Sequence, residues 1–143
     1  MCQATYDDAN LILRLYDLRR EEKLRAARGW FLANFHCKTM DELNKLCPSG
    51  SDANANYRQF VSYWEMCASF VTSGVLNAEL FFANTRECLV CWERVKLVAA
   101  EARVAYKDPN FLINLEKCGA QFAEWMIRTS GEDAYKAYVA RVA

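Results

Sequence analysis

Two cysteines, Cys88 and Cys91, form a C-x-x-C pattern, a spacing that suits either a redox pair or two zinc ligands. On a helix these thiols project about 60° apart, and they lie well inside the expected helix, away from the amino terminus where the dipole lowers a thiol pKa. A zinc site needs further ligands, and the cluster available to supply them is His36, Cys37 and Cys47. We expect buried small side chains, with metal binding and redox chemistry as alternatives.

The chain contains one histidine, His36, which limits the enzymatic chemistry open to it. Di-iron helical bundles need Glu-x-x-His pairs on two helices, so that class is excluded. His36 adjoins Cys37, but neighbouring side chains on a helix point about 100° apart, which disfavours a Cys–His catalytic pair. The sequence also lacks the nucleotide-binding and hydrolase motifs G-x-x-x-x-G-K-[ST], G-x-G-x-x-G, H-E-x-x-H and G-x-S-x-G. We therefore predict no catalytic residue, no cofactor and no metal.

Glu65 is the carboxylate with the strongest case for chemistry, because most other positions of its helix are apolar or aromatic. Burial raises a carboxyl pKa towards the range of a general base, whereas an arginine partner opposes that shift. Arg86 is the expected partner, and the rings of Trp64 and Trp92 would line a pocket beside the pair. We expect a structural ion pair and keep a functional carboxylate in a pocket as the alternative.

The charge balance argues against a nucleic-acid partner, because 18 basic residues offset 18 acidic ones and the pI is near 6.6. The arginines between Arg14 and Arg28 scatter around the helix among acidic residues, as on a solvated surface. The apolar stretch 9–18 is interrupted by polar residues and is far shorter than the ~20 residues that span a bilayer. The first residues also lack a secretory signal pattern. We predict a cytoplasmic protein without membrane insertion.

The elements that position these residues are expected to be helices. Five Gly and two Pro among 143 residues leave few turns and so favour long elements, and no alternating strand pattern competes. We predict a single all-α domain over residues 1–143, a bundle of about five to six helices. A long first helix would span 7–36, capped by Asp7 or Asp8, and the helical core would span 55–143. Thr39-Met40-Asp41-Glu42 matches a capping box and predicts a short helix to about Leu46.

A long antiparallel hairpin is expected to form the centre of the bundle. Gly74 and Asn77 fit a tight turn between helices over 55–73 and 78–107, with Gly74 left-handed and Asn77 as the next cap. Contacting positions would then sum to about 151. Two charge pairs satisfy this sum: Arg58 with Glu93 and Glu65 with Arg86. Asp108-Pro109 is expected to open a further helix to about 129.

The hairpin also carries a pattern of residues with a family resemblance. These residues are Trp64, Glu65, Ala68, Val71, Gly74, Leu76, Glu79, Leu80, Trp92, Arg103, Phe111, Leu115 and Glu116. Over about residues 57–126, half of the chain, the sequence resembles a bacterial all-helical family of unknown function. The resemblance implies a helical fold but no activity. Some members of that family carry an amino-terminal transmembrane helix. This sequence differs from them there, because Arg14, Asp17 and the following residues are charged.

The function expected from these features is a non-enzymatic interaction or scaffold module. Apolar residues cover more faces of the first helix than one core contact needs. They are Leu11, Ile12, Leu13, Leu15, Tyr16 and Leu18. We expect this surface, above all Leu11, Ile12, Leu15 and Leu18, to bind another protein or a second copy as a homodimer. The alternative is a bundle that binds a small ligand, or an enzyme, with its pocket near Glu65 and Arg86.

Overall fold

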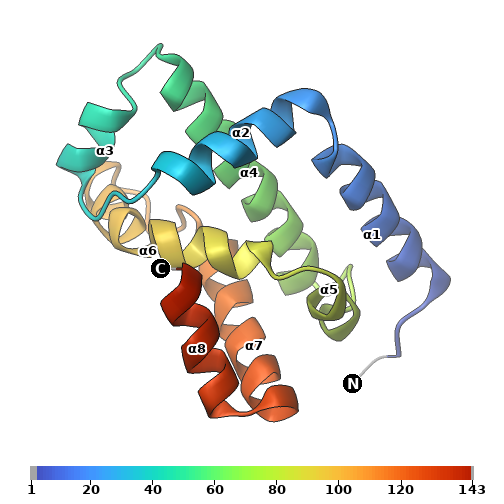
Figure 1. Cartoon of the computed structure of the whole chain (residues 1–143). Helices are drawn as coiled ribbons and strands as arrows, with labels where there is room; N and C mark the ends of the chain where they lie inside the picture. The colour runs from blue at the N-terminus through green and yellow to red at the C-terminus, as the bar shows by residue number, and fades with distance from the viewer. Residues whose placement is uncertain (1–2, 143) are drawn as a thin grey trace.

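The computed structural model describes residues 3–142, and this part of the chain is helical without any strand. The all-α prediction is confirmed, but the described residues form eight helices in place of five or six (Figure 1). They are α1 (Tyr6–Arg19), α2 (Glu22–Asn34), α3 (Met40–Leu46), α4 (Asp52–Thr72), α5 (Ala78–Asn84), α6 (Glu87–Ala105), α7 (Ile113–Ser130) and α8 (Glu132–Val142). No helix within residues 3–142 combines the length and the apolar character needed to cross a membrane.

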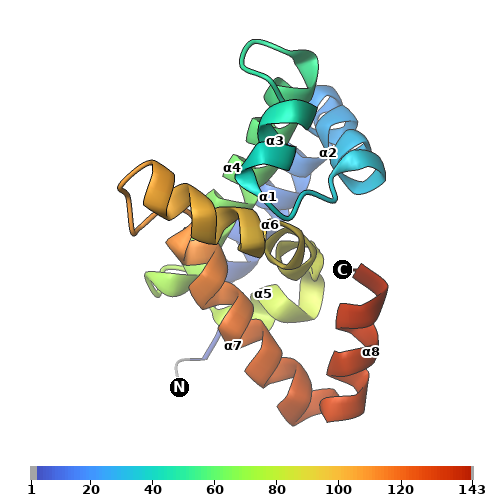
Figure 2. The same cartoon turned by 90° about the vertical axis from the view of Figure 1, so that its left-hand side faces the viewer.

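Helix α4 lies at the centre and packs against α2 and α7, while α6 crosses it. Figures 1 and 2 show α7 and α8 as an antiparallel pair that extends away from α3. Aromatic stacking fills the space between α2 and α4, where the ring of Phe31 lies 4.7 Å from that of Phe35 and 4.4 Å from that of Phe60. Each fully buried large side chain of this kind contributes about 1.5–3 kcal/mol, so burial dominates the stability of the fold.

The predicted long first helix is wrong, because it is broken into α1 and α2. The chain leaves helical geometry at Glu21, with φ −59° and ψ 141°. The Glu21 carboxylate then accepts hydrogen bonds from the N–H groups of Lys23 and Leu24, so it caps α2 and makes the break inexpensive. The bend lets Leu15 on α1 and Phe31 on α2 both reach the core, which one straight rod could not achieve.

The predicted antiparallel hairpin is also wrong beyond its turn. Gly74 is left-handed with φ +84°, and the Asn77 side chain caps α5 by accepting from the N–H of Leu80, so both turn assignments are confirmed. The second rod, however, breaks at Thr85, which is extended with φ −151° and ψ 141°. Helix α5 packs against α7 and α1, and α6 crosses α4 instead of running alongside it (Figure 1).

The start of α1 differs in its capping residue. Thr5 is the N-cap, and Asp8 completes a reciprocal capping box with it, whereas Asp7 or Asp8 was expected as the cap. The second Asp8 oxygen accepts from the N–H of Asn77 at 2.8 Å, which ties α1 to the turn before α5. These backbone donors, Asn77 first and then Thr5, lower the pKa of Asp8. The predicted Thr39 cap of α3 is confirmed, with the Glu42 N–H donating to Thr39 Oγ1 at 3.1 Å.

Candidate functional site

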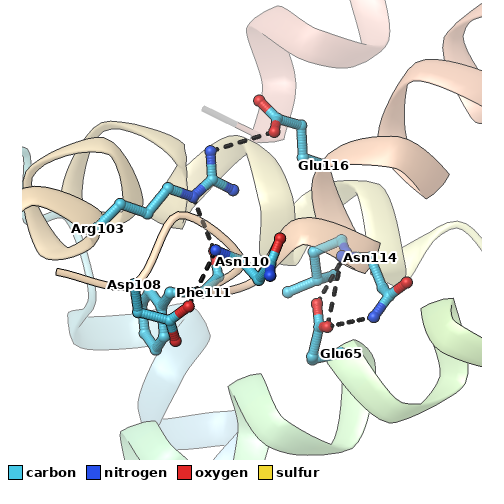
Figure 3. A network of polar contacts seen from close by, with 8 residues as sticks. Glu65, Arg103, Asp108, Asn110, Phe111, Asn114 and Glu116 are labelled. Carbon is cyan, nitrogen blue, oxygen red and sulfur yellow. Dashed lines mark hydrogen bonds and ion pairs between the residues drawn. The ribbon is translucent and has the colours of Figure 1, made fainter. Parts of the chain in front are cut away.

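Glu65 does not pair with Arg86 but caps the start of α7 (Figure 3). Its carboxylate accepts hydrogen bonds from the N–H of Leu115 at 2.8 Å, from Asn114 Nδ2 at 2.8 Å and from the N–H of Asn114 at 3.4 Å. Helix α7 begins at Ile113, not at Pro109 as predicted, because the backbone of Leu112 is left-handed with φ 55°. Leu112 is the N-cap residue, and its side chain cannot accept a hydrogen bond from the first amides of the helix. A carboxylate from α4 therefore satisfies amides that the local sequence leaves open.

The connection before α7 is held by a second set of polar contacts (Figure 3). Arg103 Nε donates to the carbonyl of Phe111 at 2.8 Å, and Arg103 Nη1 pairs with Glu116 at 3.1 Å. The Asn110 N–H donates to Asp108 at 3.0 Å, which closes the turn over 108–110. The Glu65 carboxylate bonds only to groups at the start of α7, so its position is explained by the architecture. Arg103 Nη2, in contrast, is buried and has no hydrogen-bond partner in the described chain.

Replacing Glu65 with glutamine is expected to lower the free energy of unfolding by about 1–2 kcal/mol, because hydrogen bonds to charged groups contribute about 1.5–3 kcal/mol and the amide retains only one acceptor oxygen. The matched control is Glu124→Gln, at an exposed position of the same α7 helix that Glu65 caps. We expect the control to change stability by less than about 0.5 kcal/mol. Urea unfolding followed by circular dichroism measures both, and equal values for the two variants would contradict the capping role.

The other residues of the predicted site are also dispersed. Trp64 is buried on the face of α4 towards α1, and Trp92 packs against Gly119 of α7. Arg86 is the N-cap of α6, where its guanidinium lies over the ring of Tyr138. The second expected pair, Arg58 with Glu93, is not formed, since Glu93 pairs with Lys96 instead. The structure therefore does not assemble the predicted pocket of Glu65, Arg86, Trp64 and Trp92.

The cysteines are buried, as expected for Cys88 and Cys91, but Cys88 lies in the first turn of α6 and not well inside a helix as predicted. All six cysteines within residues 3–142 are buried and free of disulfides. Cys88 Sγ lies 3.9 Å from Cys118 Sγ on α7, so its sulfur neighbour is not Cys91. The contact with Cys118 and burial raise the pKa of Cys88, and burial raises the pKa of Cys91. Groups of three or more metal-binding side chains are absent from the described part of the chain.

Sequence reasoning missed a basic cleft where α1, α2, α6 and α8 meet. Its volume is about 490 Å³. Five arginines line it, together with one carboxylate, that of Glu87, giving a formal charge of +4. The arginines are Arg19, Arg28, Arg86, Arg94 and Arg141. Only folding brings them together, because they come from four helices, and we name this feature the arginine cleft.

Glu87 is the carboxylate that lines the cleft and is only 9% exposed. Arg28 Nε donates to one oxygen of its carboxylate, and Arg19 Nη1 lies 3.7 Å from the other. Arg94 is committed elsewhere: its Nη1 donates to the carbonyl of Leu32 at 2.8 Å and its Nε to that of Val142 at 3.1 Å. A single carboxylate thus faces two guanidiniums and leaves the cleft strongly positive.

Arg86 and Arg141 form no ion pair with a carboxylate within residues 3–142. Their guanidinium carbons lie 5.9 and 5.3 Å from the centroid of the Tyr138 ring. Two like charges beside one ring repel each other, and an anion next to them would lower that energy. Helix α6 also begins here without a side-chain cap, and its amino terminus adds partial positive charge. The cleft is therefore suited to an anion.

The predicted interaction surface on α1 is partly buried within the chain. Leu15 is only 5% exposed and belongs to the core, and Leu11 and Ile12 pack against it. Leu15 is therefore unavailable to a partner. Large apolar side chains do remain exposed on α1. They are Tyr6, Leu13, Tyr16 and Leu18.

Comparisons with known proteins identify a family but no activity. A family model described as a domain of unknown function, DUF4760, matches residues 4–122, which is most of the chain. No curated protein matches the sequence. No solved structure matches it either.

Proposed function

The chain belongs to the DUF4760 family of unknown function, and from the geometry of its own residues we propose that it is a non-enzymatic binding module that holds a small anion in the arginine cleft. The observation that carries this proposal is the charge of the cleft, which five arginines and one carboxylate line. A cleft lined by charges of one sign focuses the electrostatic field and raises the local concentration of ligands of the opposite charge. The proposal retains the expected ligand-binding alternative but places the ligand at Arg86 without Glu65.

A phosphate or a carboxylate fits the available donors better than a neutral ligand does. Guanidinium groups bind these planar or tetrahedral oxyanions through two parallel hydrogen bonds. The guanidinium groups of Arg86 and Arg141 form no ion pair with a carboxylate of the described chain, and both lie beside Tyr138. The concave shape and the four-helix origin of the cleft favour a small ligand over an extended nucleic acid, which requires a continuous basic track.

Inorganic phosphate and pyrophosphate are the probes that test the anion site. Isothermal titration calorimetry at low ionic strength is expected to give saturable binding to the wild-type chain. Arg86→Gln and Arg141→Gln should each weaken it at least tenfold, because each removes a charge-assisted contact worth about 1.5–3 kcal/mol. The matched control is Arg58→Gln, an exposed arginine of α4 outside the cleft, which should leave the affinity within twofold. Absent binding, or equal effects of all three variants, would refute the site.

A second candidate function rests on the exposed apolar side chains of α1. Tyr6, Leu13 and Tyr16 lie on one side of the helix, and Leu13 is 61% exposed. Such a stripe supports the expected contact with another protein or with a second copy, and the homodimer and the cytoplasmic location remain predictions. Light scattering of the wild type and of Leu13→Ser tests self-association: a dimer that the substitution dissociates supports this candidate, and a monomer at high concentration removes the homodimer.

A further inference from the structure

An apolar slot lies beside the arginine cleft, between α1, α4 and α5. Its volume is about 270 Å³. Its largely apolar lining includes Ile12, Leu15, Tyr63, Trp64, Cys67 and Phe81. The Tyr63 hydroxyl donates a hydrogen bond to the carbonyl of Leu15. The polar atom of this side chain is therefore already bonded, and its ring forms an apolar part of the slot wall. These side chains therefore offer an occupant mainly hydrophobic contact.

The slot and the cleft meet at shared residues. Arg19, Asn84 and Thr85 line both. Thr85 Oγ1 is buried and has no hydrogen-bond partner in the described chain, although buried hydroxyls are normally bonded. The Arg19 guanidinium lies 5.2 Å from the Tyr16 ring centroid on the slot side and 3.7 Å from Glu87 on the cleft side. An apolar space thus opens onto positive charge at Arg19, beside an unpaired hydroxyl that its neighbours cover.

We propose that slot and cleft form one site for an anionic amphiphile, a molecule with a single phosphate or carboxylate head and an unbranched alkyl tail. The head lies against Arg19 and Arg86, and the tail fills the slot towards Trp64 and Phe81. This inference rests on the proposed anion site and adds the class of ligand. Charge complementarity selects this occupant, because a neutral lipid would leave the guanidiniums uncompensated and a free phosphate would leave the slot empty.

The size of the slot sets the length of the tail. A cavity of about 150 Å³ holds benzene with its six carbon atoms, so 270 Å³ has room for about ten. Each buried methylene raises affinity by about fourfold. A tail that reaches the end of the slot therefore binds much more tightly than a stub that only enters it.

The experiment compares alkyl phosphates of one head and different tails. Butyl phosphate and decyl phosphate are titrated by calorimetry below the critical micelle concentration, with decyl maltoside as a neutral-headed control. We expect decyl phosphate to bind at least a hundredfold more tightly than butyl phosphate. Decyl maltoside should bind at least tenfold more weakly than decyl phosphate.

Two variants locate the tail. Ile12→Trp adds bulk to the slot and is expected to weaken decyl phosphate binding at least tenfold while leaving butyl phosphate within threefold. The matched control is Val104→Trp, at an exposed apolar position near the end of α6, which should change neither affinity. Circular dichroism of both variants verifies that the helices are intact before the titrations.

The outcomes separate the inference from the proposed function on which it rests. If both phosphates bind equally and Arg86→Gln weakens both, the amphiphile is refuted and the anion site stands. If neither phosphate binds, both proposals fail. Sedimentation with vesicles that contain phosphatidic acid, combined with no binding of monomeric decyl phosphate, would overturn the free ligand in favour of a membrane surface.

Discussion

Replacing Arg94 with methionine is expected to destabilise the fold by about 3 kcal/mol. Arg94 lies on α6 and donates to carbonyls at two helix carboxyl termini, those of Leu32 on α2 at 2.8 Å and Val142 on α8 at 3.1 Å. A further contact reaches the carbonyl of Phe31 at 3.3 Å. Hydrogen bonds to a charged donor contribute about 1.5–3 kcal/mol each, and the helix dipoles favour a cation at these ends.

The measurement is urea unfolding, with amide hydrogen exchange to locate the effect. Protection of α8 should fall most, because α8 ends on this contact and packs mainly against α7. Arg94→Lys should recover only part of the loss, since an ammonium cannot reach both helix ends with the planar guanidinium geometry. Arg25→Met, at an exposed position of α2, serves as control and should cost less than about 0.5 kcal/mol. A loss below 1 kcal/mol for Arg94→Met would contradict this role.

Gly119→Ala is expected to destabilise the protein by about 2–3 kcal/mol, although alanine is the better helix former. A Cβ atom at position 119 would lie 2.7 Å from Cδ1 and 3.3 Å from Cγ of Trp92. The indole ring is rigid and packed between α6 and α7, so the helices must separate to admit the methyl group. Overpacking of this kind costs about 1–3 kcal/mol.

The matched control is Gly29→Ala, at a helical glycine of α2 whose added Cβ would meet nothing within 4 Å. It should stabilise the protein by about 0.5–1 kcal/mol through helix propensity alone. The double variant Gly119→Ala with Trp92→Leu tests the cause, because a smaller side chain at 92 leaves room for the methyl group. If Gly119→Ala costs as much in the Trp92→Leu background as in the wild type, the close contact is not the reason.

The local features of the chain were predictable from residue types at neighbouring positions. The Thr39 cap, the left-handed Gly74 and the Asn77 cap all depend on hydrogen bonds or backbone geometry within a few residues. The all-α class follows equally from low Gly and Pro content and from the spacing of apolar residues. Such signals survive folding because their partners are fixed by chain connectivity.

The predictions were wrong where the helix propensity of the local residues was small compared with the free energy gained by burying apolar side chains. Nothing near Thr85 forbids a continuous helix, yet the break lets Phe82 and Leu89 enter the core on two differently directed helices. Helix propensities differ by at most about 0.7 kcal/mol for ordinary residues, whereas one buried aromatic or leucine contributes about 1.5–3 kcal/mol. The predicted ion pair of Glu65 with Arg86 was wrong for the same reason, because it assumed a continuous antiparallel hairpin.

By itself, the sequence determined an all-helical chain, the Thr39 and Asn77 caps and the family, since these follow from local chemistry and from the pattern of residues over 4–122. The tertiary structure alone decided that Glu65 caps α7 and that arginines from four helices line one cleft with Glu87. The reason is physical: a cleft depends on the directions in which helices cross, and those directions are set by the packing of the whole core.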